Sequence, residues 1–496
     1  MPAETARPRA ALLALFGFAE LVLLFAASRI RDPFAHLAVF LALSAGAFVA
    51  CVLAAREAAR ETTGADACAP DGALRGAGAR TATDRRALLF VLTAGALFRA
   101  IFLASPPALS SDVYRYVWDA RAQAAGVNPF AHPPAAAEVA FLNDADASKI
   151  NHPEISTIYP PLSQAAFRLG RAIAPGPLGM KIVFSFLDLC VALAAIVWLS
   201  PSPQRRLGAA VLLAWNPLSV IETAGSGHND PLAILLLLAA IRAAGAARIG
   251  PGAARAASAA GLARAPNGGI ALAAGALLGA AAAAKTLPLL LAPAFAVALG
   301  RSRALPFVAG LAAVLIASYA PFAGAGAALF RGLRAYALDL EFNASLFATL
   351  ESILAHTFAP SLLRDRIPHL LPILPVLAAP ILVRAARGDL SRVSFWTLGA
   401  LVCVGSQVHP WYLLWVLPFA ATRPSGFARA WLWFSILVLL SYATQAAFAA
   451  SGVWRESAWV RIAQYAPLYG ALLLDAARAF RGRSRAFRSA RPASTG

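Results

Sequence analysis

Charged residues are scarce in this sequence. Only 14% of its 496 residues are Asp, Glu, Lys or Arg, whereas a soluble domain carries about 25%. Apolar residues make up 59% of the chain, and apolar runs near the roughly 20 residues that a spanning helix needs recur along it. A cleavable signal peptide is not expected, because residues 10–28 are longer than a signal core and no small-residue cleavage site clearly follows. The composition therefore predicts an all-α polytopic membrane protein.

Cysteine is also scarce, with four residues in the chain. Three of them lie in apolar runs and Cys68 lies in a polar loop, and no two form a close-spaced pair or a metal-ligand pattern. A disulfide framework is therefore not expected. Sequence repeats are absent as well. The Ala- and Gly-rich run 270–284 only looks repetitive, because small residues allow membrane helices to pack closely.

Acidic residues are few compared with basic ones, 24 against 43, which gives a formal net charge of +19. Such a charge would suit a nucleic-acid partner if the basic residues shared one compact face. They cluster instead in short connectors, such as Arg205–Arg206, and in the tail. The tendency of cytoplasmic loops to be basic explains this pattern. We therefore expect no nucleic-acid partner, and we place the N-terminus and the basic connectors in the cytoplasm.

The apolar runs predict about 13 or 14 transmembrane helices. The candidate spans lie near 10–28, 34–55, 87–104, 180–200, 207–223, 231–246, 270–284, 286–300, 304–323, 367–384, 393–408, 411–422, 429–450 and 459–477. Two segments on the predicted outer side, 105–179 and 324–366, are too long to be connectors. The predicted domains are an N-terminal helical hairpin with a cytoplasmic linker (1–86), a transmembrane domain that carries both outer loops (87–477) and a basic cytoplasmic tail (478–496).

On this topology, every short outward motif rich in acidic, basic or aromatic residues falls on one face, and the cytoplasmic face has no such cluster. A transporter would gather its ionisable residues near the bilayer midplane, where the candidates are Glu20, Asp188 and Glu222. The one-sided distribution favours an enzyme that acts at the outer membrane surface on a lipid-linked substrate. A polytopic lipid or solute transporter, or flippase, is the alternative.

Asp112 begins the first outward motif, "SDVYRYVWDARAQAAGVNPF". A helix over 112–125 would be amphipathic and would lie in the membrane interface. The residues that would share one side of it are Tyr114, Val117, Trp118 and Arg121. Either Ser111 or Asp112 would suit the N-cap of this helix. Asp112 would equally suit a general base that takes a proton from an acceptor hydroxyl, and the two roles are compatible.

The hexapeptide "GSGHND", residues 225–230, lies between two long apolar runs. A tight turn explains its glycines, and Asp230 followed by a proline suits a helix start. The turn does not explain His228, with Glu222 about two helical turns before Asp230. Ionisable residues near a membrane are usually functional. We therefore expect Glu222, His228, Asn229 and Asp230 to bind phosphate or hydroxyl groups or to hold a divalent cation.

Lys285 interrupts two apolar runs, where a charge is costly unless it snorkels or pairs. It is either an interfacial anchor or a ligand for the phosphate of a lipid donor. His409 and Tyr412 lie in "HPWYLLW", which reads either as part of an aromatic belt or as a binding element for the donor head group.

Three further residues complete the candidate substrate site. Tyr159, in "TIYPPLSQ", belongs to a rigid extended turn and could line a sugar pocket. Glu341 and Asn343, in "EFNASLF", cap a loop helix or bind substrate.

Taken in order, these motifs resemble those of bacterial membrane glycosyltransferases of the C superfamily. The similarity is greatest to the polyprenol-phosphate-mannose-dependent mannosyltransferases. The matching stretches cover roughly residues 87–475 and also include "WNPLSVIETAGSGHND", "KTLPLLLAP" and "HPWYLLWVLP". One departure is that the family's first outer loop follows its first span, whereas here it follows the third. Either the hairpin 10–55 is an addition or the number of spans differs.

The resemblance implies transfer of a hexose, with mannose as the expected sugar, from a polyprenyl-phosphate donor to a glycan or glycolipid acceptor of the cell envelope. The reaction would invert the anomeric carbon and occur on the extracytoplasmic face of the plasma membrane. Asp112 matches the family's acidic catalytic residue, and Lys285 and His409, with Arg331 or Arg334, would neutralise the leaving phosphate. A divalent cation is left open, since some members of the superfamily use one.

Overall fold

The computed structural model describes residues 3–63, 73–200, 203–248, 267–357, 367–423 and 426–489. Within these ranges the chain is helical and has no β-strand, and one isolated β-bridge joins Phe342 to Gln407. The predicted all-α class is confirmed.

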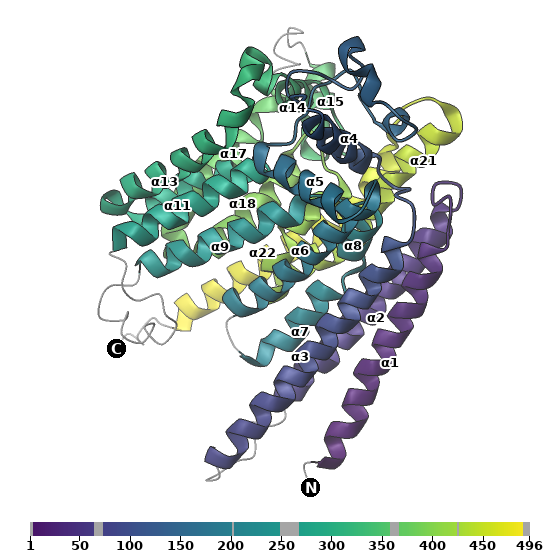
Figure 1. Ribbon diagram of the computed structural model, residues 1–496. Coiled ribbons are helices and arrows are strands. Elements are labelled where there is room, and N and C mark those ends of the chain that lie inside the picture. The colour runs from purple at the N-terminus through teal and green to yellow at the C-terminus, as the bar shows by residue number, and fades with distance from the viewer. Residues whose placement is uncertain are drawn as a thin grey trace.

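The N-terminal part consists of three long helices that lie side by side (Figure 1). They are α1 (Ala3–Ser28), α2 (Leu37–Thr63) and α3 (Ala73–Leu103). A Cβ atom on Gly17 of α1 would lie 2.8 Å from the Trp215 ring, so α1 packs tightly onto the rest of the protein. Both hairpin helices contribute to the main apolar core. Helices α2 and α3 extend into the expected linker, whose residues 64–72 lie outside the described ranges, and the domain boundary at residue 86 stays a prediction.

The first long loop folds into short helices around a small core of its own. These helices are α4 (Asp112–Ala124), η1 (Ala137–Leu142), η2 (Ala147–Lys149) and α5 (Pro161–Ile173). The rings of Tyr116 and Phe167 stack with centroids 4.5 Å apart, and Phe184 meets Phe167 edge-on. Tyr114 and Trp118 are also buried in this core. Helix α4 is therefore packed inside the protein and not laid on the membrane interface, because the loop supplies enough apolar surface to cover its aromatic side.

The remaining chain forms the central bundle and the layers around it. Its first half contains α6 (Pro177–Trp198), α7 (Pro203–Ala214), α8 (Pro217–Val220), the π-helical turn η3 (Ile221–Gly225), α9 (Asp230–Arg248), α11 (Asn267–Ala284), η5 (Leu287–Leu291), α12 (Ala292–Leu299) and α13 (Arg301–Tyr319). Its second half contains η6 (Ala320–Phe330), α14 (Arg331–Asp339), α15 (Leu346–His356), η7 (Pro368–Leu370), α17 (Ile373–Ala385), α18 (Leu390–Val404), η8 (Pro410–Trp415), α19 (Leu417–Thr422), α20 (Gly426–Leu437), η9 (Val438–Ser441), α21 (Tyr442–Ser451) and α22 (Ala458–Ser489).

Eight helices in the described ranges are long and apolar enough to cross a membrane, or nine if a bent pair counts as one span. The pair is Arg205–Ala214 with Pro217–Gly225, bent by 42°. Four further apolar helices, among them Gly268–Ala284 and Leu390–Val404, have only 10–17 residues, fewer than the roughly 20 that span a bilayer. The expected number of 13 or 14 is thus higher than the number that passes on length and composition, because several apolar runs break into shorter helices. The multi-pass character is confirmed.

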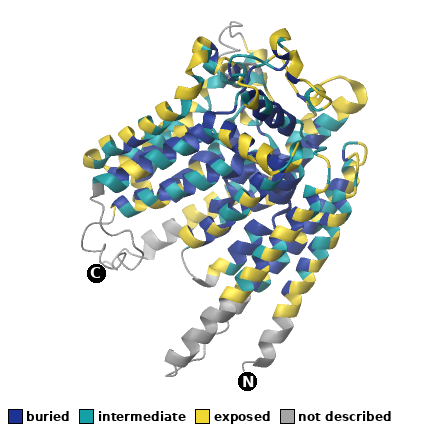
Figure 2. Ribbon diagram, viewed as in Figure 1, coloured by how far each residue is buried: buried dark blue, intermediate teal, exposed yellow. Residues whose placement is uncertain are grey.

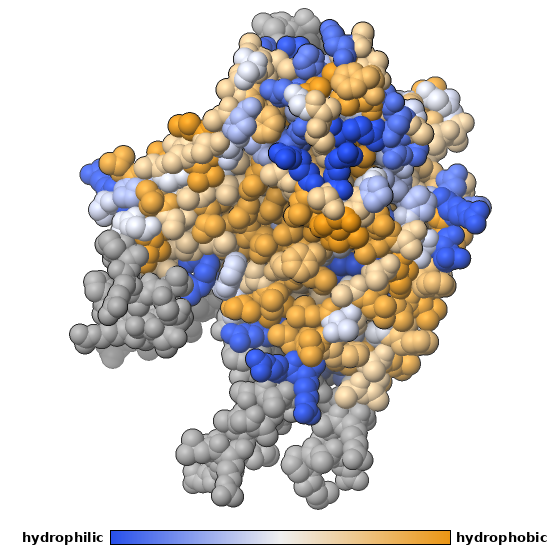
Figure 3. All heavy atoms as spheres, viewed as in Figure 1, coloured by the Kyte–Doolittle hydropathy of each residue, from blue (hydrophilic) through white to orange (hydrophobic). Residues whose placement is uncertain are grey.

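The long loops gather at one end of the molecule, which we call the loop end. Figure 1 shows α4, α5, α14 and α15 there, far from the start of α1. Figure 2 shows buried segments running through α6, α9 and α4. On the face in Figure 3, a broad apolar band crosses the middle, with hydrophilic residues above it at the loop end and others at the opposite end. Such a band between two polar zones is the surface that a lipid bilayer requires.

Two acidic residues inside the bundle have different surroundings. Asp188 accepts hydrogen bonds from Arg99 (Nε, 3.1 Å) and Ser219, and is neutralised by an ion pair with the same arginine. Glu20 is fully buried, and neither carboxyl oxygen has a hydrogen-bond partner among the described residues. The charge of Arg99, on α3, acts on this buried carboxyl group.

Candidate active site

Polar side chains from four parts of the chain meet at the loop end. Helix α4 supplies Asp112, the turn before α9 supplies His228, and Asp230 is the first residue of α9. Lys285 follows α11, and η8 adds its aromatic rings. These elements are far apart in the sequence, so only the tertiary fold brings them together.

Asp112 is the first residue of α4, and its carboxylate points into this cluster. It accepts hydrogen bonds from Tyr159 (Oη to Oδ2, 3.2 Å) and Asn151 (Nδ2 to Oδ1, 3.4 Å), and its side chain is 19% exposed. Ser111 makes no side-chain capping bond. Burial raises the pKa of Asp112, and the charge of Lys285 opposes that rise. A partly accessible carboxylate with a raised pKa has the properties of a general base.

A buried carboxylate that the sequence reasoning did not single out fixes Asp112 and Tyr159 relative to each other. Asp119, about two helical turns after Asp112 on α4, forms an ion pair with Arg115 (Nε, 2.8 Å). It also accepts hydrogen bonds from Thr157 (2.5 Å) and Gln164 (2.8 Å). A fully buried charge is tolerated only with such complete pairing. Because Thr157 immediately precedes the Tyr159 turn, this network locks the turn onto α4.

The hexapeptide 225–230 is a turn whose shape positions His228. The π-helical turn at Ile221–Gly225 precedes it, and such turns are frequent at functional sites. The backbone N–H of His228 donates to the carbonyl of Glu222 at 2.9 Å. Gly227 has φ = +80°, and a Cβ there would lie 3.0 Å from Val113 of α4. This position therefore needs glycine, both for its conformation and for the close approach to α4.

The buried His228 ring lies between two carboxylates. Its Nε2 is 3.4 Å from Glu222 Oε2, and its Nδ1 is 3.9 Å from Asp112 Oδ2. Tyr442 donates a 2.8 Å hydrogen bond to the other oxygen of Glu222. Among the described residues, neither imidazole nitrogen has a hydrogen-bond partner. Burial, and then the charge of Lys285, lowers the pKa of His228 well below its usual range, so the ring is neutral at neutral pH.

Lys285 is paired within the cluster. Its Nζ lies 3.0 Å from Asp230 Oδ2 and 3.4 Å from Asn229 Oδ1, and its side chain is 21% exposed. Trp415 donates a 2.7 Å hydrogen bond to the other oxygen of Asp230. Asn229 in turn donates to Ser163 of α5 at 2.8 Å. Lys285 is thus an oriented cation at the cluster, and not a side chain that snorkels away from it.

A row of stacked rings runs from the second loop to the hexapeptide. Adjacent centroids are 4.7 Å apart from Phe342 to His409, 4.3 Å from His409 to Trp411, and 3.6 Å from Trp411 to His228. Burial, with the charge of Lys285, lowers the pKa of His409 to about 3. Both imidazoles of the row are therefore uncharged at neutral pH. Tyr412 packs edge-on against His409.

Tyr412 extends the cluster to the second loop. Its hydroxyl is 2.6 Å from that of Tyr336, and Lys285 Nζ lies 5.9 Å from the centre of its ring. The sequence did not single out Tyr336, Trp415 and Tyr442. Trp415 belongs to the motif that contains His409 and Tyr412, so its position was an available signal, whereas Tyr442 lies in an apolar span with no local signal.

Two predicted substrate residues flank Phe342 of the row of stacked rings. Asn343 is buried and exchanges hydrogen bonds with Gln464, and its Nδ2 also donates to the carbonyl of Val408, the residue before His409, at 3.2 Å. Its backbone N–H donates to Glu456, so Asn343 joins the second loop both to α22 and to the segment that carries His409. Glu341 is exposed, and its pKa is raised by partial burial and by the charges of Glu351 and Glu456. Their roles in binding stay predictions.

Arg331 and Arg334, expected near the leaving phosphate, are exposed on α14. No ion pair between either side chain and the cluster occurs among the described residues.

The acidic residues of the cluster do not form a metal centre in the described part of the chain, where no group of three or more His, Cys, Asp or Glu side chains has a suitable arrangement. Asp230 is already bonded to Lys285 and Trp415, and one oxygen of Glu222 to Tyr442. These carboxylate oxygens are already occupied by hydrogen bonds and an ion pair, so they do not fit the coordination of a divalent cation.

A multi-pass helical protein that orients a partly exposed carboxylate and a lysine in one polar cluster, at the end of an apolar bundle, has the organisation that an enzyme of the membrane surface needs. Comparison with family models refines this class. The model described as alpha-(1->6)-mannopyranosyltransferase, N-terminal domain, matches residues 32–301, more than half of the chain. The chain belongs to this family and is a glycosyltransferase that transfers mannose from a sugar donor to a glycan acceptor. No curated protein and no solved structure matched.

The matched range covers most of the cluster. It begins inside the N-terminal hairpin and includes Asp112, Tyr159, the hexapeptide and Lys285. His409 and η8, which carries Trp411 and Tyr412, lie beyond it.

Proposed function

We propose that the protein moves mannose from a polyprenyl-phosphate donor to a glycan or glycolipid acceptor outside the plasma membrane, with inversion at the anomeric carbon. The observation that carries this proposal is that one partly exposed carboxylate, Asp112, and one partly exposed cation, Lys285, lie in the same otherwise buried cluster, where the charge of Lys285 acts on Asp112. Transfer from a phosphate leaving group needs both a base and a positive charge.

In the proposed step, the acceptor hydroxyl oxygen attacks the anomeric carbon of mannose while the bond from that carbon to the phosphate oxygen breaks. Asp112 takes the hydroxyl proton, and polyprenyl phosphate leaves with the bonding electrons. A single displacement of this kind inverts the anomeric configuration. The raised pKa of Asp112 makes its carboxylate a stronger base than an ordinary aspartate.

Lys285 carries the positive charge that would meet the leaving phosphate. His409 and His228 are uncharged at neutral pH, because burial lowers the pKa of each ring. They would therefore orient the donor by hydrogen bonds and ring contacts, and would not neutralise its charge. The free imidazole nitrogens and the stacked rings suit a sugar that presents hydroxyl groups on its edge and C–H bonds on its face.

The proposed location is the extracytoplasmic face of the plasma membrane. It rests on the short basic connectors, such as Arg205–Arg206, which belong on the cytoplasmic side. The long loops and the cluster would then face the lipid-linked donor on the other side.

The test is a transfer assay in proteoliposomes with radiolabelled polyprenyl-phosphate-mannose and an α-mannoside acceptor. We expect labelled product with the opposite anomeric configuration to the donor. Asp112→Asn should reduce the rate at least about a hundredfold, the usual contribution of a general base. Glu154→Gln, an exposed acid of the same loop, is the control that should retain the wild-type rate.

An equal rate for wild type and Asp112→Asn would refute the role of Asp112. Lipid or sugar flux without transfer would favour the transporter alternative. That alternative lacks support from Asp188, whose charge is neutralised by Arg99.

A further inference from the structure

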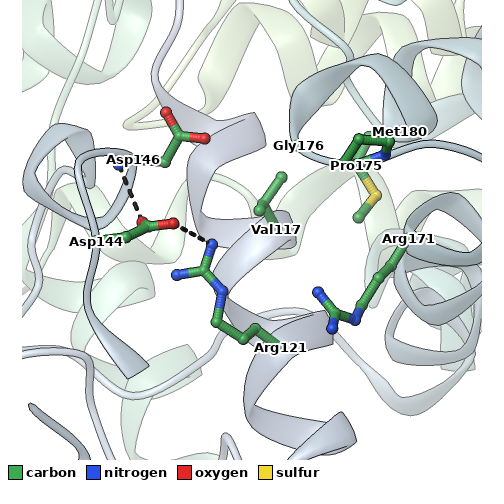
Figure 4. A pocket seen from close by; sticks show the side chains of 8 residues that line it. All are labelled: Val117, Arg121, Asp144, Asp146, Arg171, Pro175, Gly176 and Met180. Carbon is green, nitrogen blue, oxygen red and sulfur yellow. Dashed lines mark hydrogen bonds and ion pairs between the residues drawn. The ribbon is translucent and has the colours of Figure 1, made fainter. Parts of the chain in front are cut away.

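A second polar site lies on another side of α4 from the cluster. It is a cavity of about 360 Å³ (Figure 4), and this volume is in the range of small-ligand pockets. The residues that line it are Val117, Arg121, Asp144, Asp146, Arg171, Pro175, Gly176 and Met180. None of them belongs to the candidate active site, so the cavity is not explained by the transfer reaction alone.

One wall of the cavity is held rigidly. Arg121 donates to the carbonyl of Leu142 at 2.7 Å and to Asp144 Oδ2 at 2.6 Å. The other oxygen of Asp144 accepts the backbone N–H groups of Asp146 and Ala147 at 3.0 and 3.1 Å. The hydrogen bond from Arg121 lowers the pKa of Asp144, which keeps the carboxylate charged at neutral pH. A ligand would therefore meet a preformed donor and acceptor pair.

The opposite wall carries a guanidinium with no such partner. Arg171, in the last turn of α5, is exposed and makes no hydrogen bond or ion pair with any residue that the structure describes. Figure 4 shows its guanidinium turned toward the space in front of Arg121. Asp146 is paired with Lys149 at 2.9 Å. Arg171 is thus the lining group with the most unused hydrogen-bonding capacity.

The chemistry of the lining selects among ligands. Two carboxylates disfavour a bare anion and two guanidiniums disfavour a bare cation. Together they offer acceptors and donors in balance, beside the apolar surfaces of Val117, Pro175 and Met180. A neutral molecule with many hydroxyl groups and a C–H face uses all of these at once. A sugar chain has this character.

The cavity is also at a defined distance from Asp112. Nine residues of α4 separate Asp112 from Arg121, which is about 13–14 Å along the helix and half a turn around it. A ligand that reaches both places must therefore be several sugars long. We propose that this cavity binds a distal segment of the acceptor glycan, so that long acceptors are held in place while their end reacts. This inference rests on the proposed function.

The test compares two acceptors of the same enzyme in proteoliposomes, a monosaccharide α-mannoside and an α-1,6-linked mannotetraose. For Arg171→Ala, we expect the ratio of kcat/KM for the tetrasaccharide to that for the monosaccharide to fall about tenfold, the effect of losing one or two charge-assisted hydrogen bonds. Arg171→Lys should recover only part of it, because lysine lacks the planar fork. Arg168→Ala, an exposed arginine one turn earlier on α5 that does not line the cavity, should keep the wild-type ratio.

Three results would overturn the inference. The first two are an unchanged ratio in Arg171→Ala and an equal loss of kcat/KM for both acceptors. The third is inhibition of the wild type by inorganic phosphate that is weaker in Arg171→Ala, which would indicate an anion site.

Calorimetric titration of mannotetraose separates this inference from the proposed function. Transfer by the wild type with tetrasaccharide binding that does not depend on Arg171 refutes the inference alone. If the wild type transfers no mannose, the proposed function fails, and binding that is lost in Arg171→Ala still supports the cavity. Absence of both transfer and binding refutes both.

Discussion

At the scale of single residues, the environment of Asp112 decides which chemistry it performs. Four charged or titratable groups influence it, namely Lys285, Asp230, His228 and Tyr159, and the amide of Asn151 donates a hydrogen bond to it. Burial raises its pKa, and Lys285 is the main influence that lowers it. The same aspartate on an open loop would be a weaker base, so its position and not its type makes it the candidate.

This environment predicts the pH dependence of transfer. The base must be deprotonated, so kcat/KM should fall as the pH drops through the pKa of Asp112, and the acid limb should lie above the ordinary aspartate value of 3.8. Lys285→Met removes a positive charge that favours the carboxylate. The acid limb of the residual activity should therefore move to higher pH.

The measurement is kcat/KM against pH for both proteins at saturating donor. Glu154→Gln is again the matched control and should keep the wild-type profile. An acid limb that moves to lower pH in Lys285→Met would contradict the charge interaction on which the prediction depends.

At the scale of elements, the site depends on a few tight backbone approaches. The turn between η3 and α9 must pass close to α4 in order to hold His228 beside Asp112. Gly227 makes this possible, since a Cβ would lie 3.0 Å from Val113 and 3.2 Å from Lys181. The sequence indicated a glycine-rich turn here, but it could not show which glycine touches which helix.

Gly227→Ala should destabilise the protein by about 1–2 kcal/mol, because alanine is strained at φ = +80° and has no room beside α4. The variant should also transfer mannose more slowly, because His228 moves with the turn. Gly245→Ala, at an open position of α9 with no atom within 4 Å of the added Cβ, is the control and should keep or raise stability.

Thermal unfolding in detergent measures both variants. Equal melting temperatures for Gly227→Ala and the wild type would show that the turn adapts, and would remove the argument for a fixed His228.

At the scale of the whole molecule, one apolar band separates two polar ends (Figure 3). The proposed orientation puts the loop end outside the cell and the basic connectors inside. In a background without the native cysteines, Glu154→Cys should react with an impermeant maleimide on intact cells, and Arg205→Cys should react only after lysis. Both side chains are exposed, so accessibility within the protein does not limit the reaction. The reverse labelling pattern would invert the topology.

The sequence predicted this organisation well where physical chemistry acts locally. Apolar runs determined the class and most of the long helices, because a bilayer imposes length and composition on each span separately. Polar motifs singled out Asp112, His228, Asp230 and Lys285, because charge beside a membrane is costly unless it is used. The structure places these four residues in one cluster, and their roles stay predictions. The number of spans was less predictable, because breaks such as Asn216–Pro217 divide apolar runs into short helices.

Only the tertiary structure decided how these residues relate to one another. It paired the Lys285 ammonium with Asp230, stacked the Trp411 ring on that of His228, and bonded Asp119 to Thr157 at the Tyr159 turn. It also left Glu341 outside the cluster, although the motif around it looked equivalent. The reason is physical: burial and pairing depend on contacts between separate segments, which in these three cases are 38 to 183 residues apart, and such contacts give no periodic pattern in the sequence. Composition thus determined a helical membrane protein, and packing decided which of its polar residues share a site.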